Sequence, residues 1–180
     1  MAMLPILTAP DRRLRTRSAP VTAVDADVRR LMDDMLETMR AAPGIGLSAV
    51  QVGVPRRVVV VEAPETIAED SPDAVPRMLC LANPKITWSS QETILFEEGC
   101  LSLPDQYAEI ERPAEVTVKF LDRDGRRQEA RAAGILARCV QHELDHLEGL
   151  LLVDRLSHVR RNMILRKLSK ARKQKHSTAA

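Results

Sequence analysis

Aromatic side chains are scarce in this chain of 180 residues, which holds one Trp, one Tyr and two Phe. That scarcity argues against the aromatic stacking platforms that bind single-stranded nucleic acid. No apolar run approaches the roughly 18 residues of a membrane-spanning helix, which excludes a helical membrane protein. The three cysteines are an odd count; they do not build a disulfide framework, so we expect a reducing compartment. The short apolar stretch at Met1–Leu7 lacks a preceding charged region and predicts no secretory signal.

Acidic residues are absent from 155–180, a stretch that carries nine Lys or Arg. The rest of the chain has 18 basic and 25 acidic residues, a net charge of −7. A basic tail on an acidic domain can bind nucleic acid or a ribonucleoprotein surface, or it can be a solvated helix face. Length and composition predict a single domain over residues 1–180, in which 155–180 form a basic C-terminal helix and tail.

Hydrophobic spacing predicts an α+β fold: an N-terminal helix, antiparallel strands around a central helix, and a basic C-terminal helix. Helices are expected over residues 25–41, from Gly134 to about Leu150, and from about Ser157 onward. The last helix is expected to bury Val159, Met163 and Leu168. Short strands are expected at 58–61, 78–82, 85–89, 92–96, 116–121 and 126–132, and a surface loop at 63–76.

The sharpest local pattern lies in the central helix, where the sequence reads Gln-His-Glu-Leu-Asp-His over residues 141–146. Two histidines four residues apart, His142 and His146, lie about 40° apart around a helix axis and can reach one ion. Glu143 stands one step round the helix, close enough to contact a water without being a ligand. This is the H-E-x-x-H arrangement of hydrolytic metal sites. Two surface histidines that match by chance are the alternative.

A metal site of this kind needs a third protein ligand. Leu152 occupies the position where metzincins have their third histidine, which excludes that family. Cys139 lies too far from His146 along the same helix and is interpreted as a wall residue beside the site. Cys80 lies in an apolar strand and is interpreted as a core residue. His158 and His176 are further alternatives, but they lie in or beside the basic tail and are interpreted as exposed. The best candidate for the third ligand is then Cys100, which leaves a fourth position open, as a catalytic site requires.

A glycine-rich segment, 44–53, follows the first helix. It has no Lys-Ser or Lys-Thr of a phosphate loop, and it does not follow a strand as a dinucleotide fingerprint must. It is either a tight turn or a backbone that lies against a ligand, with Gln51 offering an amide donor.

The three segments in this order, 44–51, 98–102 and 142–146, resemble the peptide deformylase motifs G-φ-G-φ-A-A-x-Q, E-G-C-φ-S and H-E-φ-D-H, where φ is apolar. The resemblance implies a cytoplasmic hydrolase that removes the formyl group from the formylmethionine of nascent chains and releases formate. It implies that Cys100, His142 and His146 hold one divalent ion. That ion is usually Fe²⁺, and zinc, nickel or cobalt can replace it.

The resemblance also assigns roles to other residues. Glu143 would take a proton from water and pass one to the leaving amine. The Gln51 side chain and the backbone N–H of Leu101 would stabilise the oxyanion. The residues expected to bind the substrate are Gly44, Ile45, Gly46, Glu98 and Cys139, and Glu98 is expected to pair with Arg112 behind the site.

Two residues depart from the family pattern. Ser48 stands where the family usually has Ala. Tyr107 and its surroundings replace a stretch in which many bacterial members carry a basic residue that holds the peptide backbone. These departures leave open a deformylase-like protein with an altered substrate. Another H-E-x-x-H metallohydrolase is a second alternative, which the Cys100 segment disfavours. A non-enzymatic metal-stabilised module that binds ribosomes is a third, which Glu143 disfavours.

The expected partners follow from the resemblance and the charge pattern. They are formylmethionyl nascent peptides and, through the basic C-terminal helix, the ribosome. No membrane partner and no sequence-specific nucleic acid are expected.

Overall fold

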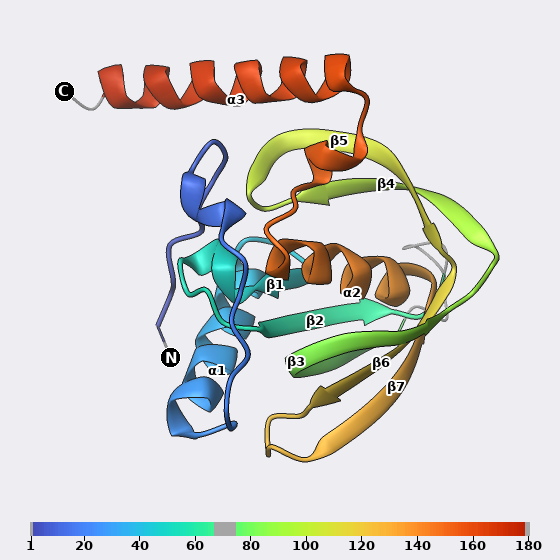
Figure 1. The fold of residues 1–180 in the computed structure, drawn as a ribbon. Coiled ribbons are helices and arrows are strands. Elements are labelled where there is room, and N and C mark those ends of the chain that lie inside the picture. The colour runs from blue at the N-terminus through green and yellow to red at the C-terminus, as the bar shows by residue number, and fades with distance from the viewer. Residues whose placement is uncertain (1, 67–74, 179–180) are drawn as a thin grey trace.

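The structure, a computed structural model, describes residues 2–66 and 75–178. It has the expected α+β composition, with helices packed on antiparallel strands (Figure 1). The helices are α1 (Ala26–Ala41), α2 (Gly134–Leu147) and α3 (His158–Thr178), with short 3₁₀ turns η1 (Arg12–Arg15), η2 (Ala49–Val52) and η3 (Leu152–Arg155). The strands are β1 (Gly46–Ser48), β2 (Val58–Pro64), β3 (Pro76–Ser89), β4 (Thr93–Cys100), β5 (Leu103–Pro113), β6 (Glu115–Leu121) and β7 (Arg127–Ala133).

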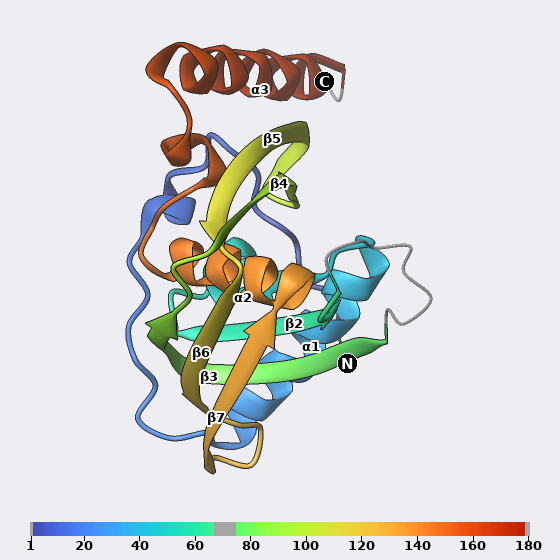
Figure 2. The ribbon, with the colours of Figure 1, turned by 90° about the vertical axis from the view of Figure 1, so that its right-hand side faces the viewer.

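An antiparallel sheet of five strands, in the order β1-β2-β3-β6-β7, lies between α1 and α2 (Figures 1 and 2). Strand β2 shows why its sequence is a run of valines. Val59 and Val61 pack in the cluster that contains α2, whereas Val58 and Val60 pack in the cluster that contains α1. A strand buried on both faces needs an apolar side chain at every position, so it shows no alternation.

Helix α1 forms where the spacing predicts it. The side chain of Asp25 caps its first turn by accepting a hydrogen bond from the backbone N–H of Val28 at 2.9 Å. The buried stripe includes Met32, Met35 and Met39, which are core residues. Cys80 is buried in the same cluster, as expected.

The strand predictions need three corrections. Strand β1 (Gly46–Ser48) forms within the glycine-rich segment, where no strand was expected. The two strands expected at 78–82 and 85–89 are one strand, β3, with a register shift between Ala82 and Lys85. Strand β5 was not expected, and Pro104 is its second residue. The ladder between β4 and β5 skips Pro104, so its missing N–H costs no inter-strand hydrogen bond. These two strands form a separate ribbon next to the five-stranded sheet.

The C-terminal predictions also need correction. Helix α2 ends at Leu147 and not near Leu150. In α3, Leu168 is buried as expected, but Val159 and Met163 are 82% and 62% exposed. The reason is that α3 lies on the outside of the molecule and packs through one side only, with Ile164 and Leu168 against the cluster that includes β5 and η3 (Figure 1).

Part of the expected loop at 63–76 and the last two residues of the tail lie outside the described residues. None of the described helices is long and apolar enough to cross a membrane.

Candidate metal centre and active site

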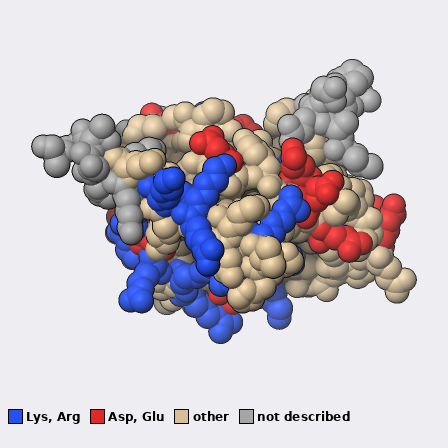
Figure 3. Space-filling model, turned by 90° about the horizontal axis from the view of Figure 1, so that it is seen from above, with Lys and Arg blue, Asp and Glu red and all other residues tan. Residues whose placement is uncertain are grey.

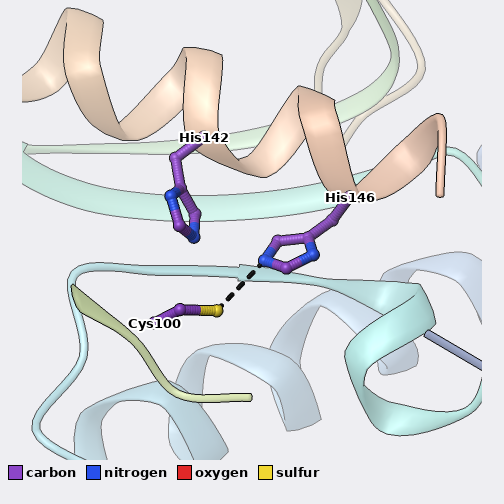
Figure 4. A group of neighbouring side chains, drawn as sticks. All are labelled: Cys100, His142 and His146. Carbon is purple, nitrogen blue, oxygen red and sulfur yellow. Dashed lines mark hydrogen bonds between the residues drawn. The ribbon is translucent and has the colours of Figure 1, made fainter. Parts of the chain in front are cut away.

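Two segments far apart in the sequence, α2 and the end of β4, meet at the centre of the molecule. The helix presents His142, Glu143 and His146 on one buried face, and the end of β4 presents Cys100 opposite them. Figure 4 shows both imidazoles directed from the helix toward the sulfur. The possible ligand atoms of Cys100, His142 and His146 all lie within 4.8 Å of one another, and Sγ of Cys100 is 3.2 Å from Nε2 of His146. A thiolate and two imidazoles within that space can share one ion.

Two buried polar atoms at this place lack a hydrogen-bond partner among the described residues. They are Nδ1 of His146 and Oε2 of Glu143. The Nδ1 atom of His142, in contrast, lies 3.0 Å from Oε2 of Glu98. A carboxylate on the outer nitrogen of a histidine fixes the ring and leaves its Nε2 atom free to bind an ion. The arrangement therefore fits a metal ion at the Nε2 side of both rings.

The two acids of the site have opposite pKa shifts. Burial raises the pKa of Glu143 to about 7, although the charge of His142 and the neighbouring hydroxyl group of Ser48 act in the other direction. Burial would raise the pKa of Glu98 too, but hydrogen bonds to His142 and Arg112 outweigh it and hold that pKa at about 2. Glu98 is thus a permanent anion that orients its neighbours, whereas Glu143 is suited to accept and release a proton near neutral pH.

Glu98 and Arg112 form the buried ion pair that the family resemblance implied. Nε and Nη2 of Arg112 donate to the two carboxylate oxygens, and the Nη2 contact is 2.9 Å. Sequence reasoning missed that Arg112 also donates to Asp145 at 3.0 Å. Asp145 belongs to the H-E-φ-D-H segment, so the motif itself was the available signal.

Gln51 lies in η2 with its carboxamide buried against the β4–β5 turn. Its Nε2 atom donates to Oγ of Ser102 at 3.1 Å and lies 3.7 Å from Sγ of Cys100. Its Oε1 atom accepts hydrogen bonds from the backbone N–H and the hydroxyl of Ser48. Sequence reasoning gave no role to Ser102, which the E-G-C-φ-S motif contains.

A cleft of about 680 Å³ opens beside these residues, between the β1 segment, the β4–β5 ribbon and α2. All five residues expected to bind the substrate line it, together with Leu101: Gly44, Ile45, Gly46, Glu98 and Cys139. Arg138, which sequence reasoning did not single out, lines it as well and stacks 5.2 Å above the ring of Phe96. Tyr107 lies at the cleft and is 62% exposed.

Gly46 is required by close packing at the floor of this cleft. A Cβ atom at this position would lie 2.6 Å from both Sγ of Cys139 and Oε1 of Glu143. The backbone of β1 can approach α2 only because position 46 has no side chain.

The polypeptide deformylase family model matches residues 3–162, which include every residue of this centre. The chain belongs to the peptide deformylase family. A peptide deformylase of Methylocella silvestris is 53% identical over 173 residues, covering 96% of this chain and 87% of the relative. The crystal structure of the Ehrlichia chaffeensis peptide deformylase superimposes with a TM-score of 0.89 at 41% identity, covering 97% of this chain and 99% of that one.

A third comparison is with an Acinetobacter baumannii peptide deformylase solved with bound Met-Ala-Ser. It has a TM-score of 0.79 and 37% identity, and it covers 86% of this chain and 99% of that chain. Family membership makes the chain a hydrolase that removes the N-formyl group from nascent peptides. It also overturns the alternatives of an unrelated H-E-x-x-H peptidase and of a non-enzymatic module.

Proposed function

We propose that Cys100, His142 and His146 hold one divalent ion in this deformylase, and that the ion in the cell is Fe²⁺. The observation that carries the proposal is the convergence of one sulfur and two imidazole nitrogens within 4.8 Å. Zn²⁺, Ni²⁺ and Co²⁺ suit the same mixed ligand set and can replace iron. When bound, such an ion is a Lewis acid that lowers the pKa of water and polarises a carbonyl.

The residues around the ion carry out the proton transfers and stabilise the developing oxyanion. Glu143, with its pKa near 7, takes a proton from the attacking water and passes one to the leaving amine. Nε2 of Gln51 and the backbone N–H of Leu101 donate hydrogen bonds to the formyl oxygen as negative charge develops on it. Addition of water and cleavage of the C–N bond yield formate and a free amino terminus.

The cleft accounts for binding of the methionine. Ile45 and Cys139 offer an apolar wall for its side chain, and the backbone of 44–46 lines the cleft along the path of the peptide main chain. The carboxylate of Glu98 is engaged by His142 and Arg112, so we assign Glu98 a positioning role within the substrate cleft. The bound Met-Ala-Ser of the Acinetobacter baumannii relative supports a peptide that continues beyond methionine.

The deciding experiment is anaerobic formate release from formyl-Met-Ala-Ser by the Fe²⁺-loaded protein, beside its Glu143→Ala variant. We expect the parent to turn over, and the variant to be slower by about 10²- to 10⁴-fold because the proton carrier is lost. Metal content is measured for both, since Glu143 is not a proposed ligand and the variant should keep its ion. No release from a correctly metallated parent would contradict the proposal.

We further propose that the enzyme works in the cytoplasm as a single catalytic domain of residues 1–180, and that α3 docks it on the ribosome. Figure 3, seen from the α3 side, shows Lys and Arg gathered on this face. Among the side chains of α3 that the structure describes, the exposed basic ones are Arg160, Arg166, Lys167, Lys170 and Arg172. A basic surface of this kind suits the phosphates of a ribonucleoprotein.

Deleting α3 is a poor test because Ile164 and Leu168 belong to a core cluster. Charge reversal of Arg166, Lys167 and Lys170 keeps those contacts. We expect the reversed protein to lose salt-sensitive cosedimentation with ribosomes. A matched control reverses Lys85, Arg126 and Arg127, which are exposed elsewhere on the molecule. Equal binding by both variants would contradict docking through α3.

A further inference from the structure

A continuous series of charge-assisted hydrogen bonds runs from His142 to Arg155 at the surface. Nδ1 of His142 lies 3.0 Å from Oε2 of Glu98, and the same oxygen accepts from Nη2 of Arg112 at 2.9 Å. Nη1 of Arg112 donates to Oδ2 of Asp145 at 3.0 Å. Asp145 in turn accepts two hydrogen bonds from Arg155, each 2.7 Å long. The series therefore joins β4, β5, α2 and η3.

From Glu98 outward, exposure increases along this series. The side chains of Glu98 and Arg112 are each 2% exposed, that of Asp145 is 17% exposed and that of Arg155 is 40% exposed. From Glu98 to Arg155 the charges alternate, so Arg112 and Asp145 each have an oppositely charged partner on either side. In a poorly solvated interior such contacts are strong, and the loss of one partner is costly because the remaining charge stays buried.

Arg112 links the buried and the surface ends of this series because its guanidinium group donates hydrogen bonds to two carboxylates. Its Nε and Nη2 atoms hold Glu98, and its Nη1 atom holds Asp145. Arg155 neutralises Asp145 from the outer side with both arms of its guanidinium group. If Arg155 were absent, Asp145 would attract the guanidinium group of Arg112 more strongly and draw it away from Glu98. The carboxylate that fixes the ring of His142 would then be held less firmly.

We propose that Asp145 and Arg155 are positioning residues that keep the imidazole of His142 oriented for metal binding, through Arg112 and Glu98. This inference rests on the proposed role of His142 as a ligand. Partners behind a ligating histidine fix the ring and raise metal affinity, and here that support extends from the buried carboxylate to a surface arginine. Arg155 is the last residue of η3, so the segment that leads into α3 is also tied to the metal centre.

The test compares Arg155→Ala with Arg123→Ala. Arg123 makes the same two-armed contact with Asp33, at 3.0 and 2.6 Å, with exposures of 47% and 31%, and it is not part of the series. The zinc-loaded proteins are mixed with a chromogenic chelator, and the rate of Zn²⁺ release is followed. Thermal unfolding of the metal-free proteins is measured in parallel.

We expect Arg155→Ala to release Zn²⁺ about three- to tenfold faster than the parent, less than the effect typical of a direct partner of a ligand. Arg155→Lys should lie between the two, because a single ammonium group replaces only part of the two-armed contact. Arg123→Ala should release the ion at the parent rate. Asp145→Asn keeps the shape of the side chain and should accelerate release as well, which provides a second variant if Arg155→Ala folds poorly.

Two results would overturn the inference and can be told apart. Equal release rates for the parent, Arg155→Ala and Asp145→Asn would refute the positioning role while leaving the metal site intact. A parent that does not hold one Zn²⁺ per chain, or that holds it equally well after His142→Ala, would refute the proposed metal site together with the inference.

Discussion

The hydroxyl of Ser48 donates a hydrogen bond to Oε1 of Gln51 at 2.8 Å, and the backbone N–H of Ser48 donates to the same oxygen at 2.8 Å. With its oxygen held from two sides, the carboxamide has one orientation, and its Nε2 atom faces Ser102 and Cys100. The usual family residue, Ala, would keep the backbone donor and lose the hydroxyl. Ser48, which stands where the family usually has Ala, therefore adds one hydrogen bond that orients the proposed oxyanion donor, Gln51.

Replacing Ser48 by Ala tests that support. One hydrogen bond is worth about 1 kcal/mol, so we expect kcat to fall about fivefold with little change in KM, because the donor acts on the developing charge. Steady-state formate release measures both constants. Ser18→Ala is the control, since Ser18 is a buried serine outside the cleft whose hydroxyl has no hydrogen-bond partner among the described residues. An unchanged kcat for Ser48→Ala would mean that the backbone donor alone orients Gln51.

Gly46 offers a second test of the geometry. A methyl group at this position would collide with Cys139 and with Oε1 of Glu143. We expect Gly46→Ala to lower kcat by about 10²-fold, because a displacement of about 1 Å at a catalytic group has an effect of that size. The metal content should stay at the parent value.

Gly44→Ala is the comparison for this variant. The nearest atom to a Cβ at position 44 is a terminal methyl carbon of Leu101, at 2.7 Å. Because that methyl group can move aside, the loss of kcat should be much smaller than for Gly46→Ala. Equal losses for the two variants would show that the effect does not come from Glu143.

The metal site can be tested without any activity assay. We expect one ion per chain for the parent and almost none for His146→Ala, measured by elemental analysis after loading with Zn²⁺ and desalting. His158→Ala is the matched control, because His158 is exposed on α3 and lies beside Asn162. A similar loss of metal from both variants would contradict the proposed ligand set.

The parts predictable from the sequence are those with a local signal. The four-residue spacing puts His142 and His146 on one helix face, and the apolar stripe with Asp25 as its cap defines α1. The solvent exposure of Val159 and Met163 was not predictable, because periodicity identifies the apolar side of a helix but not whether another element covers it. Strand β5 was missed because two of its buried positions hold the polar residues Gln106 and Arg112, which interrupts the apolar–polar alternation that indicates a half-buried strand.

The ion-pair series could not be read from the sequence for a different reason. Glu98, Arg112 and Asp145 lie on three separate elements and meet only in the folded chain. Charged residues at such separations carry no periodic signal, and most of them are solvated. The pair of Glu98 with Arg112 came from the family resemblance alone, and Arg155 came from the structure alone.

The pKa of Glu98 makes stability depend on pH in a defined direction. It is about 2 in the folded protein against an ordinary value of 4.5, so the ionised form is favoured by folding. The stability that Glu98 contributes is complete above about pH 4.5 and is lost as the pH falls toward 2. Urea unfolding of the metal-free parent and of Glu98→Gln at pH 6 and pH 3 measures this contribution. We expect the advantage of the parent over the variant to shrink by about 2 kcal/mol between the two pH values. An advantage that does not change would mean that Glu98 is not held as an anion by His142 and Arg112.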